Sequence, residues 1–344
     1  MAESSVELNG NEDNFYFDDY CVGDVTDGSI SVFVSSLKPQ QTYHYRAFVA
    51  EYNAQTGVYD YRYGDVLTFT TTAESSAVAP SGWLEMPAAT AGSDYYTGTF
   101  SVGDQRNYSY LYDKSRYTSL WVAYPLTKSH TTGTASSTNW NYNPDIANSY
   151  QINVKSKSYG ANYNNSTYSR GHQIPAADRK CNSTMRGQTY YLTNQTPQNQ
   201  NGFNSPMWSN LEDAVRNLTS STDTVYVVTG AAFRKVGGSE TINELYATSS
   251  SIKPSTIYIP NYYWKVLLKV KRSGDSITGA SAVGVWMEHT SYGTATAWQS
   301  HVCSVAQIQN WTGFDFFVNL PGDNNSGFEA SAEANTSWST FVNF

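Results

Sequence analysis

The chain has 344 residues, enough for one large domain or two smaller ones with a buried core. Its hydrophobic content of 40%, which includes 28 tyrosines and 9 tryptophans, excludes a disordered chain. No apolar run approaches the roughly 18 residues that cross a bilayer, so we expect no membrane span.

The net charge of −8 is concentrated at one end of the chain. Residues 1–74 hold 12 acidic and 3 basic residues, which leaves 17 acidic and 18 basic residues for the remainder. An acidic excess argues against nucleic acid binding, because phosphate contacts use lysine and arginine. Residues 75–344 carry no acidic excess, so this argument does not apply to them. Among them, residues 161–211 hold one acid, Asp178, and four bases: Arg170, Arg179, Lys180 and Arg186.

The first 76 residues are expected to form β-structure. Residues 29–72 contain "SISVFVSSL", "TYHYRAFVAEY" and "VLTFTTT", three alternating segments with turn residues between them. The runs "LKPQQTYHYRA" and "YGDVLTFTTT" resemble the later half of a bacterial fibronectin type III domain. A complete sandwich of this kind takes about 100 residues. We therefore expect a partial, all-β fibronectin type III-like module over residues 1–76.

Residues 77–95 are rich in Ala, Ser, Thr and Pro, which predicts a linker or a draped surface segment. The second domain would then cover residues 96–344. Its strand-like runs are "SLWVAYPL", "TVYVVTG", "IYIPNYYWKVLLKV" and "SAVGVWM". Abundant strands with a few helices predict an α+β fold for this part of the chain.

Two helices are predicted in this second domain. The first follows "FNSP", with Ser205 as its cap and Pro206 in its first turn. Its apolar stripe recurs at helical spacing and comprises Trp208, Leu211, Val215 and Leu218. The second helix covers "VAQIQNWTG" and ends at Gly313.

The three cysteines, Cys21, Cys181 and Cys303, have no metal-ligand spacing, and an odd number cannot all pair within one chain. Small buried thiols are the favoured interpretation. A bridge between Cys181 and Cys303 stays open for an oxidising compartment.

The stretch "YSRGHQIPAADR", residues 168–179, places one of only five histidines between Gly171 and Gln173 in a polar, loop-like setting. An imidazole titrates near neutrality and is suited to accept a proton from water. A glycine before it lets the backbone approach a ligand closely. A lone histidine is more often an ordinary surface or core residue, so the stretch alone does not establish catalysis.

The wider sequence around His172 resembles the DNA/RNA non-specific endonucleases, which are ββα-metal nucleases. Residues 168–179 match their D-R-G-H block. The likeness continues in order through "SLWVAYPL", "YYLTNQTPQNQNGFNSPMWSNLEDAVRNL", "VYVVTGAAF", "IPNYYWKV" and "GFDFFVNLP". Several ordered blocks are more specific than any single motif. The resemblance implies a ββα-metal nuclease domain with a central antiparallel sheet and flanking helices.

Residue by residue, the resemblance implies that His172 is the general base and that Asn204 is the one direct protein ligand of a divalent metal. Glu212 falls where a carboxylate holds metal-bound water. Arg170 and Arg216 match arginines that contact phosphate or product, and Asn194 matches a polar residue that lines the site. The implied cofactor is Mg²⁺, for which Mn²⁺ is expected to substitute.

These roles agree with simple physical arguments. One amide ligand leaves most of the Mg²⁺ shell to waters and phosphate oxygens, which this ion prefers. Glu212 lies eight residues after Asn204, a helical rise of roughly 12 Å, so contact through water is easier than joint ligation. Arg216, at i+4, is able to pair with Glu212 or to turn to phosphate. Each residue also has a structural interpretation. Glu212 and Arg216 would form an i,i+4 helix pair, Asn204 would be a cap or turn residue, and Arg170 would be a solvated charge.

Two positions depart from the family pattern. Ser169 stands where many members have the aspartate of D-R-G-H, and Thr138 stands where Serratia-type enzymes have an arginine before "NW". Both departures are expected to lower activity without removing the base or the metal ligand.

Two functions follow from these observations. The first is a Mg²⁺-dependent endonuclease, secreted, cell-surface or periplasmic, that cleaves DNA and RNA through phosphate contacts with little sequence preference. The start "MAESS" is interpreted as one placed after a removed native leader, so secretion stays open. The alternative is a catalytically weakened adhesin or carbohydrate-binding protein on a nuclease-like scaffold. The oligomeric state is left open.

Overall fold

The computed structural model describes residues 42–70, 82–90, 92–136, 138–155, 158–165, 167–219, 224–323 and 326–344. By its internal contacts the chain divides into two units, Met1–Ser76 and Ala77–Phe344. In the described part of the chain no helix is both long and apolar enough to cross a membrane.

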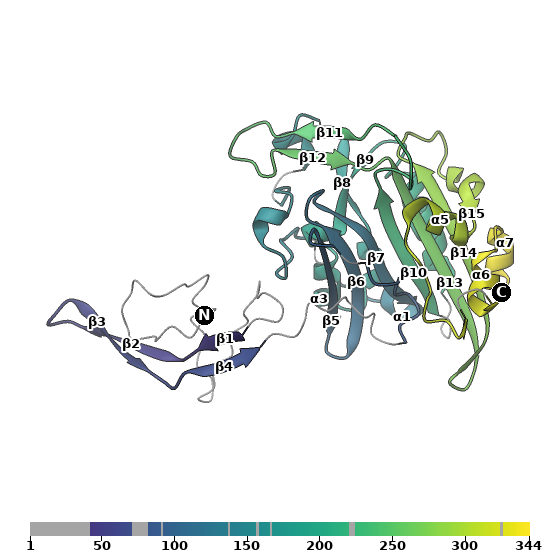
Figure 1. Ribbon diagram of the computed structural model, residues 1–344. Helices are drawn as coiled ribbons and strands as arrows, with labels where there is room; N and C mark the ends of the chain where they lie inside the picture. Colours follow the sequence, from purple (N-terminus) through teal and green to yellow (C-terminus); the bar gives the residue numbers. More distant parts are fainter. Residues whose placement is uncertain are drawn as a thin grey trace. The chain divides into compact units, whose positions relative to one another are not determined.

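The described part of the first unit consists of four strands (Figure 1). β1 (Thr42–Tyr45) pairs with β4 (Leu67–Thr70), and β2 (Phe48–Asn53) pairs with β3 (Val58–Tyr63), all antiparallel. The single strand expected over "TYHYRAFVAEY" is therefore broken into β1 and β2. The segment "SISVFVSSL" lies outside the described residues, and the fibronectin-like assignment stays a prediction.

A seven-stranded antiparallel sheet forms the centre of the second unit, in the order β15-β14-β13-β10-β7-β6-β5 (Figure 1). Its strands are β5 (Tyr95–Val102), β6 (Gln105–Asp113), β7 (Thr118–Thr127), β10 (Thr224–Ala232), β13 (Tyr262–Ser273), β14 (Ser276–Glu288) and β15 (Val302–Cys303). The four strand-like runs of the sequence are confirmed. The run 257–270 splits at Pro260 into β12 (Thr256–Ile259) and β13.

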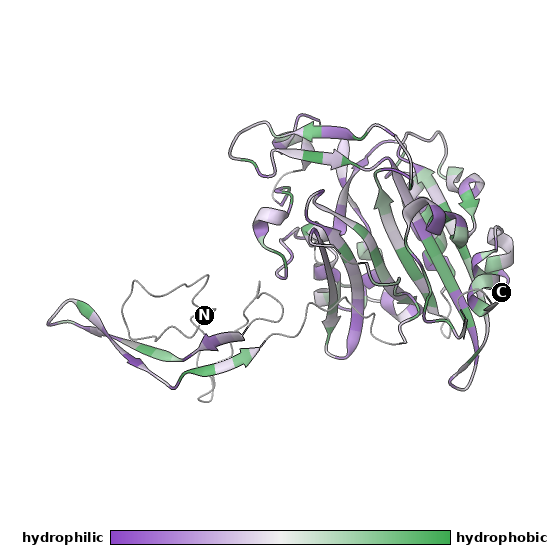
Figure 2. Cartoon of the chain, in the orientation of Figure 1, coloured by the Kyte–Doolittle hydropathy of each residue, from purple (hydrophilic) through white to green (hydrophobic). Residues whose placement is uncertain are grey.

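The sheet is buried on both faces, and its strands carry much of the hydrophobic sequence (Figure 2). Successive residues of a strand point to opposite faces. In β7, Val122 and Tyr124 accordingly belong to one hydrophobic cluster, and Trp121 and Ala123 to the other. The first cluster lies under α4 (Met207–Asn217) and the second under α5 (Val305–Thr312).

The helix after "FNSP" begins one residue later than expected. Pro206 is its N-cap residue, and no side chain caps its first turn. The prediction of Ser205 as the cap was therefore wrong. Trp208, Leu211 and Val215 are buried as the apolar stripe predicted, whereas Leu218 is only partly buried. The second helix, α5, is confirmed and ends at Gly313 with φ of 76°.

Shorter elements surround the sheet. The helices are α1 (Lys128–Thr131), α2 (Tyr159–Asn162), α3 (Ser183–Gln188), α6 (Phe328–Glu333) and α7 (Trp338–Val342). The 3₁₀ helices are η2 (Asn148–Tyr150), η3 (Ala176–Arg179), η4 (Leu192–Asn194) and η5 (Ala297–His301). The remaining strand pairs are β8 (Tyr168–His172) with β9 (Gln195–Asn199), β11 (Asn243–Tyr246) with β12, and β16 (Gly322–Asp323) with β17 (Ser326–Gly327).

The segment expected as a linker ends inside the second unit. Leu84 and Met86 are 4% and 3% exposed, and both belong to the cluster beneath α5. Cys303 is buried and Cys181 is exposed, and both thiols are free. No disulfide joins Cys181 to Cys303. The expectation of burial holds for Cys303 and fails for Cys181, and Cys21 lies outside the described residues.

Candidate active site

Arg170 and His172 lie on β8, and Asn194 ends η4. Asn204 lies in the loop before α4, and Glu212 and Arg216 lie on α4. β8 pairs antiparallel with β9, so that Ser169 lies opposite Gln198 and His172 lies opposite Gln195. His172 is thus the last residue of a strand, and the loop-like setting expected for it was wrong. Gly171 is required there, because an added Cβ would lie 2.1 Å from Oε1 of Gln198.

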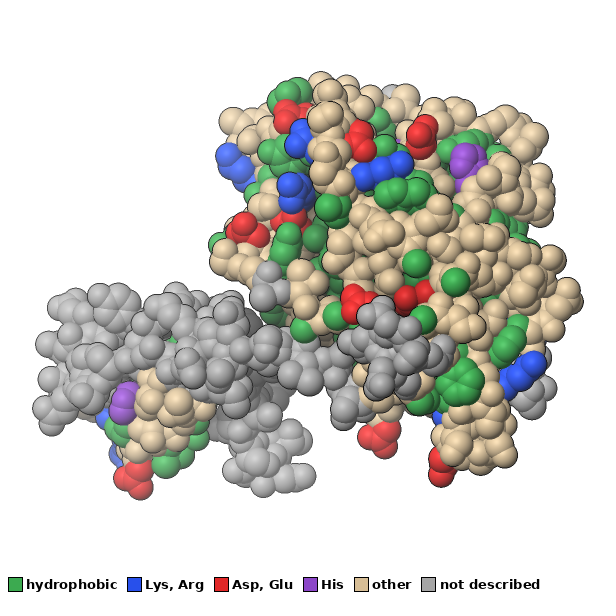
Figure 3. Space-filling model, turned by 45° about the vertical axis from the view of Figure 1, so that its right-hand side comes forward, with side chains coloured by type: hydrophobic (Ala, Val, Ile, Leu, Met, Phe, Trp, Pro, Cys, Tyr) green, Lys and Arg blue, Asp and Glu red, His purple; other side chains and the backbone are tan. Residues whose placement is uncertain are grey.

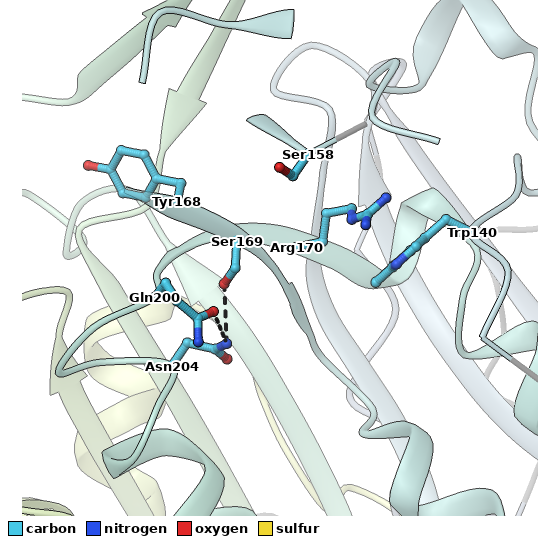
Figure 4. Close-up of a pocket in the computed structure, with 7 residues that line it drawn as sticks. All are labelled: Trp140, Ser158, Tyr168, Ser169, Arg170, Gln200 and Asn204. Carbon is cyan, nitrogen blue, oxygen red and sulfur yellow. Dashed lines mark hydrogen bonds between the residues drawn. The ribbon is translucent and has the colours of Figure 1, made fainter. Parts of the chain in front are cut away.

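A surface pocket of about 380 Å³ opens beside β8 (Figure 4). Its lining residues come from β8, from the loop before α4 and from two segments that precede β8: Trp140, Ser158, Tyr168, Ser169, Arg170, Gln200 and Asn204. Two of the predicted site residues, Arg170 and Asn204, therefore share one pocket. Ser169, the position that departs from the family pattern, directly precedes Arg170 in the sequence and lines the same pocket.

The carboxamide of Asn204 is held in a fixed orientation. Its Nδ2 donates to Oγ of Ser169 at 3.2 Å and to Oε1 of Gln200 at 3.0 Å (Figure 4). Both recorded side-chain hydrogen bonds of Asn204 use the nitrogen, which leaves the carbonyl oxygen for another partner. Amide oxygens are the atoms with which asparagine binds hard cations.

Arg170 lies on the other side of β8 from the Asn204 carboxamide (Figure 4). Its Nη1 donates to the carbonyl oxygens of Val154 at 2.8 Å and Lys155 at 3.1 Å. Its guanidinium carbon also lies 5.0 Å from the centre of the Trp140 ring. Burial lowers the pKa of Arg170, yet an arginine stays charged at all ordinary pH values.

His172 is enclosed by aromatic rings. The ring centres of Trp140 and Tyr190 lie 4.7 Å and 4.8 Å from that of the imidazole. Nε2 of His172 is buried and has no hydrogen-bond partner among the described residues. Burial, followed by the positive charges of Arg186 and Arg170, lowers the pKa of His172 to about 3. The imidazole is therefore neutral in ordinary buffers, which is the form that accepts a proton.

The structure does not bring all the predicted residues into the pocket. Neither His172 nor Glu212 lines it. Successive strand residues point to opposite faces: Ser169 contacts Asn204, whereas Arg170 and His172 both contact Trp140. His172 and Asn204 thus lie on different sides of β8.

Glu212 lies on α4 near a buried lysine. Burial raises the pKa of Glu212 to about 7, while the positive charges of Lys265 and Arg216 act against this rise. Lys265 is 1% exposed, donates to Oγ1 of Thr229 at 3.1 Å and lies 4.8 Å from the Trp208 ring centre. Burial lowers the pKa of Lys265 to about 8. A carboxyl with such a pKa exchanges protons readily near neutrality.

Arg216 pairs with aspartates instead of Glu212. Its Nη1 lies 2.6 Å from Oδ1 of Asp178, and its Nη2 donates to Asp213. Asp178 is 1% exposed and also accepts from the hydroxyl of Tyr124 at 3.0 Å. The expected i,i+4 pair is therefore replaced by an ion pair that joins α4 to η3, four residues beyond β8.

Asn194 is placed differently from the expectation that it lines the site. Its side chain is fully buried. Nδ2 donates to the carbonyl oxygens of Ile174 and Thr189, and Oδ1 accepts from the amide of Ile174. Asn194 thus fixes the backbone that follows His172 and does not face the pocket.

The two departures from the family pattern have different surroundings. Oγ of Ser169 donates to the carbonyl oxygen of Gln198 and accepts from Asn204, both at 3.2 Å. A serine therefore orients the amide where other members have a carboxylate. Thr138 is exposed and makes no recorded contact with the pocket residues.

The sequence reasoning overlooked several residues around the site. Asp178 entered the sequence analysis only as an acidic charge. Its place six residues after His172 was a signal that it lies near the site. Lys265 carried a signal, because it interrupts the apolar run "YYWKVLLKV" and therefore needs a partner inside the core. Trp140 and Tyr190 gave no signal, since they meet His172 from distant parts of the chain.

The chain belongs to the DNA/RNA non-specific endonuclease family, whose model matches residues 91–323. The fold is that of the ββα-metal nucleases, with a central antiparallel sheet and flanking helices. The predicted fold class is confirmed for this domain.

Curated relatives are nucleases. Nuclease C1 of Cunninghamella echinulata var. echinulata is 29% identical over 160 residues, which cover 46% of this chain and 61% of that protein. Mitochondrial nuclease EXOG of Danio rerio is 28% identical over 243 residues, 70% of this chain and 64% of that protein. Mitochondrial endonuclease G of Bos taurus is 25% identical over 223 residues, 65% and 71%. The chain thus spans about three fifths of the first two relatives.

A solved structure of an EndoG/EndoGI complex contains a similar fold. The match has a TM-score of 0.50 and 23% identity, and covers 67% of this chain and 89% of that one. At this level of identity the likeness concerns the fold alone.

Proposed function

We propose that the second unit is a metal-dependent nuclease that hydrolyses phosphodiester bonds of DNA and RNA. The observation that carries this proposal is the oriented carboxamide of Asn204 in a pocket that the cation of Arg170 also lines. A pocket that holds an oxygen ligand for a hard cation and a positively charged side chain suits a phosphate-containing substrate. Family membership supports the same reaction class.

The oriented amide oxygen of Asn204 supports the proposal of a single hydrated Mg²⁺. The carbonyl oxygen of Asn204 would be its direct ligand, and Glu212 would hold a metal-bound water. When bound, such an ion polarises a phosphoryl oxygen and stabilises the leaving oxygen. Mn²⁺ is expected to substitute, because it accepts the same oxygen ligands.

His172 is the proposed general base. Its buried Nε2 has no partner among the described residues, and leaving such a group unpaired costs about 1–3 kcal/mol. A water drawn in with the substrate would donate a hydrogen bond to it. Because Trp140 covers the imidazole, we propose that this indole shifts when the substrate enters. An approaching phosphate also raises the pKa of His172, since its negative charge favours the imidazolium.

The remaining residues are assigned to binding and positioning. Arg170 would contact a phosphate of the substrate. Arg216 and Asn194 would act through other residues, Arg216 by holding α4 to Asp178 and Asn194 by holding the backbone after His172. The proposed substrate contacts are to the phosphates of the nucleic acid backbone. The affinity for nucleic acid should therefore fall as the salt concentration rises and show little sequence preference.

The decisive experiment incubates the full chain with supercoiled plasmid and with RNA, with Mg²⁺ or with EDTA. Both substrates should be degraded with Mg²⁺ and remain intact with EDTA. Asn204→Ala and His172→Ala should each lower the rate by about 10²–10⁴-fold, whereas Asn201→Ala, an exposed residue of the same loop, should cleave at the wild-type rate. Intact plasmid and RNA under every condition would refute the proposal.

A second candidate function is carbohydrate binding on a weakened nuclease scaffold. It is favoured by the exposed aromatic side chains of β2 and β3, among which Tyr52, Tyr59 and Tyr61 are 57%, 55% and 43% exposed. Glycan-array binding that disappears in Tyr59→Ala, together with intact plasmid, would support it. Secretion or surface display also stays a prediction, and cell fractionation tests it.

A further inference from the structure

A cluster of three carboxyl groups lies outside the proposed nuclease site. Asp315 follows α5, and Glu329 and Glu333 lie one helical turn apart on α6. One carboxylate oxygen from each residue lies within 4.8 Å of the other two. Glu329 and Glu333 are only 5% and 7% exposed. All three line a cavity of about 250 Å³ at α5 and α6, which shares no residue with the Asn204 pocket.

Within the described residues no basic group balances these charges. The recorded ion pairs join other residues. Burial, followed by the neighbouring carboxylates of Glu329 and Asp315, raises the pKa of Glu333 to about 8. Two glutamates at i and i+4 on one helix also repel each other. Over the upper part of the face shown in Figure 3, acidic and basic side chains lie next to one another, whereas the described residues supply no basic partner for Asp315, Glu329 and Glu333.

Two oxygens of the cluster lack a partner. Oε2 of Glu329 and Oε1 of Glu333 are buried and accept no hydrogen bond from the described residues. The other oxygen of Glu333 accepts from Nε2 of Gln309 at 3.0 Å, and Oε1 of Gln309 accepts from the amide of Phe316 at 2.7 Å. Gln309 thus fixes the Glu333 carboxylate while one of its oxygens stays unsatisfied. A buried carboxylate in this state is costly unless a cation pairs with it.

We propose that Asp315, Glu329 and Glu333 bind a hard divalent cation, with Ca²⁺ as the best match, at a structural site of the second unit. An all-oxygen ligand set excludes a preference for soft metals. Ca²⁺ takes six to eight oxygens at 2.3–2.6 Å, so opposite ligands lie up to about 5 Å apart. The observed spread of 4.8 Å agrees with this geometry. The cavity leaves room for waters to complete the shell, and the ion ties α6 to the segment after α5.

The test uses the full chain carrying Asn204→Ala, so that binding at the nuclease site does not contribute. After treatment with EDTA and dialysis, CaCl₂ is titrated by calorimetry, and the melting temperature is measured with and without CaCl₂. One Ca²⁺ should bind and the melting temperature should rise. Glu329→Gln with Glu333→Gln should abolish both effects, whereas Glu288→Gln, an exposed residue, should leave both unchanged.

Three results would overturn the proposal. One is the absence of Ca²⁺ binding to the Asn204→Ala protein, which would mean that protons, not a metal, neutralise the cluster. The second is Ca²⁺ binding that persists in the double glutamine variant. If that variant does not fold, Asp315→Asn replaces it, because Asp315 is exposed. This variant should weaken Ca²⁺ binding at least about tenfold, and unchanged binding is the third overturning result.

Discussion

The guanidinium of Arg216 lies 2.6 Å from the carboxylate of Asp178, and this ion pair joins α4 to the chain that follows His172. Both side chains are largely buried, with 16% and 2% of their surface exposed. The pair therefore sets the position of the helix that carries Glu212 relative to the strand that carries His172.

Breaking this pair from one side should be strongly destabilising. Asp178→Asn leaves the Arg216 charge buried with a weaker partner, and losses of about 3–5 kcal/mol are typical in such cases. Urea unfolding of the variant measures the free energy of unfolding. Asp213→Asn serves as the control, because that side chain is 66% exposed and its removal should cost less than about 1 kcal/mol. Equal effects of both substitutions would contradict the assigned role of Asp178.

Gly171→Ala should destabilise the β8–β9 pair, because the new Cβ would lie 2.1 Å from Oε1 and 2.3 Å from Cδ of Gln198. Overpacking of this kind costs about 1–3 kcal/mol. Gln198→Ala in the same chain removes the clash and should restore part of the stability. Gly293→Ala is the matched control, since nothing lies within 4 Å of its Cβ position. The melting temperature is measured for wild type, Gly171→Ala, Gly171→Ala with Gln198→Ala, and Gly293→Ala. A Gly171→Ala protein as stable as wild type would show that the Gln198 side chain moves aside without cost.

Stability should fall as the pH drops from about 6.5 to about 4, in part through His289. Burial lowers the pKa of His289 to about 4, and its Nε2 accepts from the amide of Asn199 at 2.8 Å. In this window the unfolded chain binds a proton that the folded chain does not, so stability is present above pH 6.5 and is lost on acidification. The linkage is worth about 3 kcal/mol at most.

The measurement is urea unfolding at pH 7, 5.5 and 4 for wild type and for His289→Gln. The variant should show a shallower loss of stability across this range, because one of the histidines with a lowered pKa no longer titrates. His130 and His172, whose pKa values burial also lowers, account for the loss that remains. Identical pH profiles for the two proteins would rule out a contribution from His289.

Trp140→Ala should uncover the His172 imidazole and raise its pKa from about 3 towards the ordinary value of about 6.5, since burial is the main cause of the depression. Nuclear magnetic resonance titration of labelled histidines reports the change directly. His130 is the internal control, because burial lowers its pKa to about 4 and the ring contacts of Trp140 are with His172 and Tyr190. An unmoved His172 signal would mean that Tyr190 and the strand enclose the ring without help from Trp140.

Local sequence patterns predicted the elements whose burial repeats along the chain. Alternation and β-branched residues located β7, β10, β13 and β14, and helical spacing located α4 and α5. The pattern did not predict β8 as a strand. Its partner β9 begins 23 residues after His172. Pairing between segments so far apart in the sequence produces no local periodic pattern.

The site was predictable in part. Arg170 and Asn204 do share a pocket, as their ordered motifs indicated. Asn194 looked like a polar residue of the site because the sequence does not distinguish an amide that faces solvent from one that binds backbone. The enclosure of His172 by Trp140 and Tyr190 depends on tertiary packing, which composition and spacing do not encode.

The burial of Leu84 and Met86 beneath α5 shows where the second folding unit starts. A truncation after residue 95, as the Ala- and Pro-rich composition suggests, would remove Leu84 and Met86. The hydrophobic side chains that they cover on one face of the sheet would become exposed, which would favour aggregation. A fragment that folds by itself therefore has to retain Leu84 and Met86. A replacement of the N-terminal module should end before Leu84.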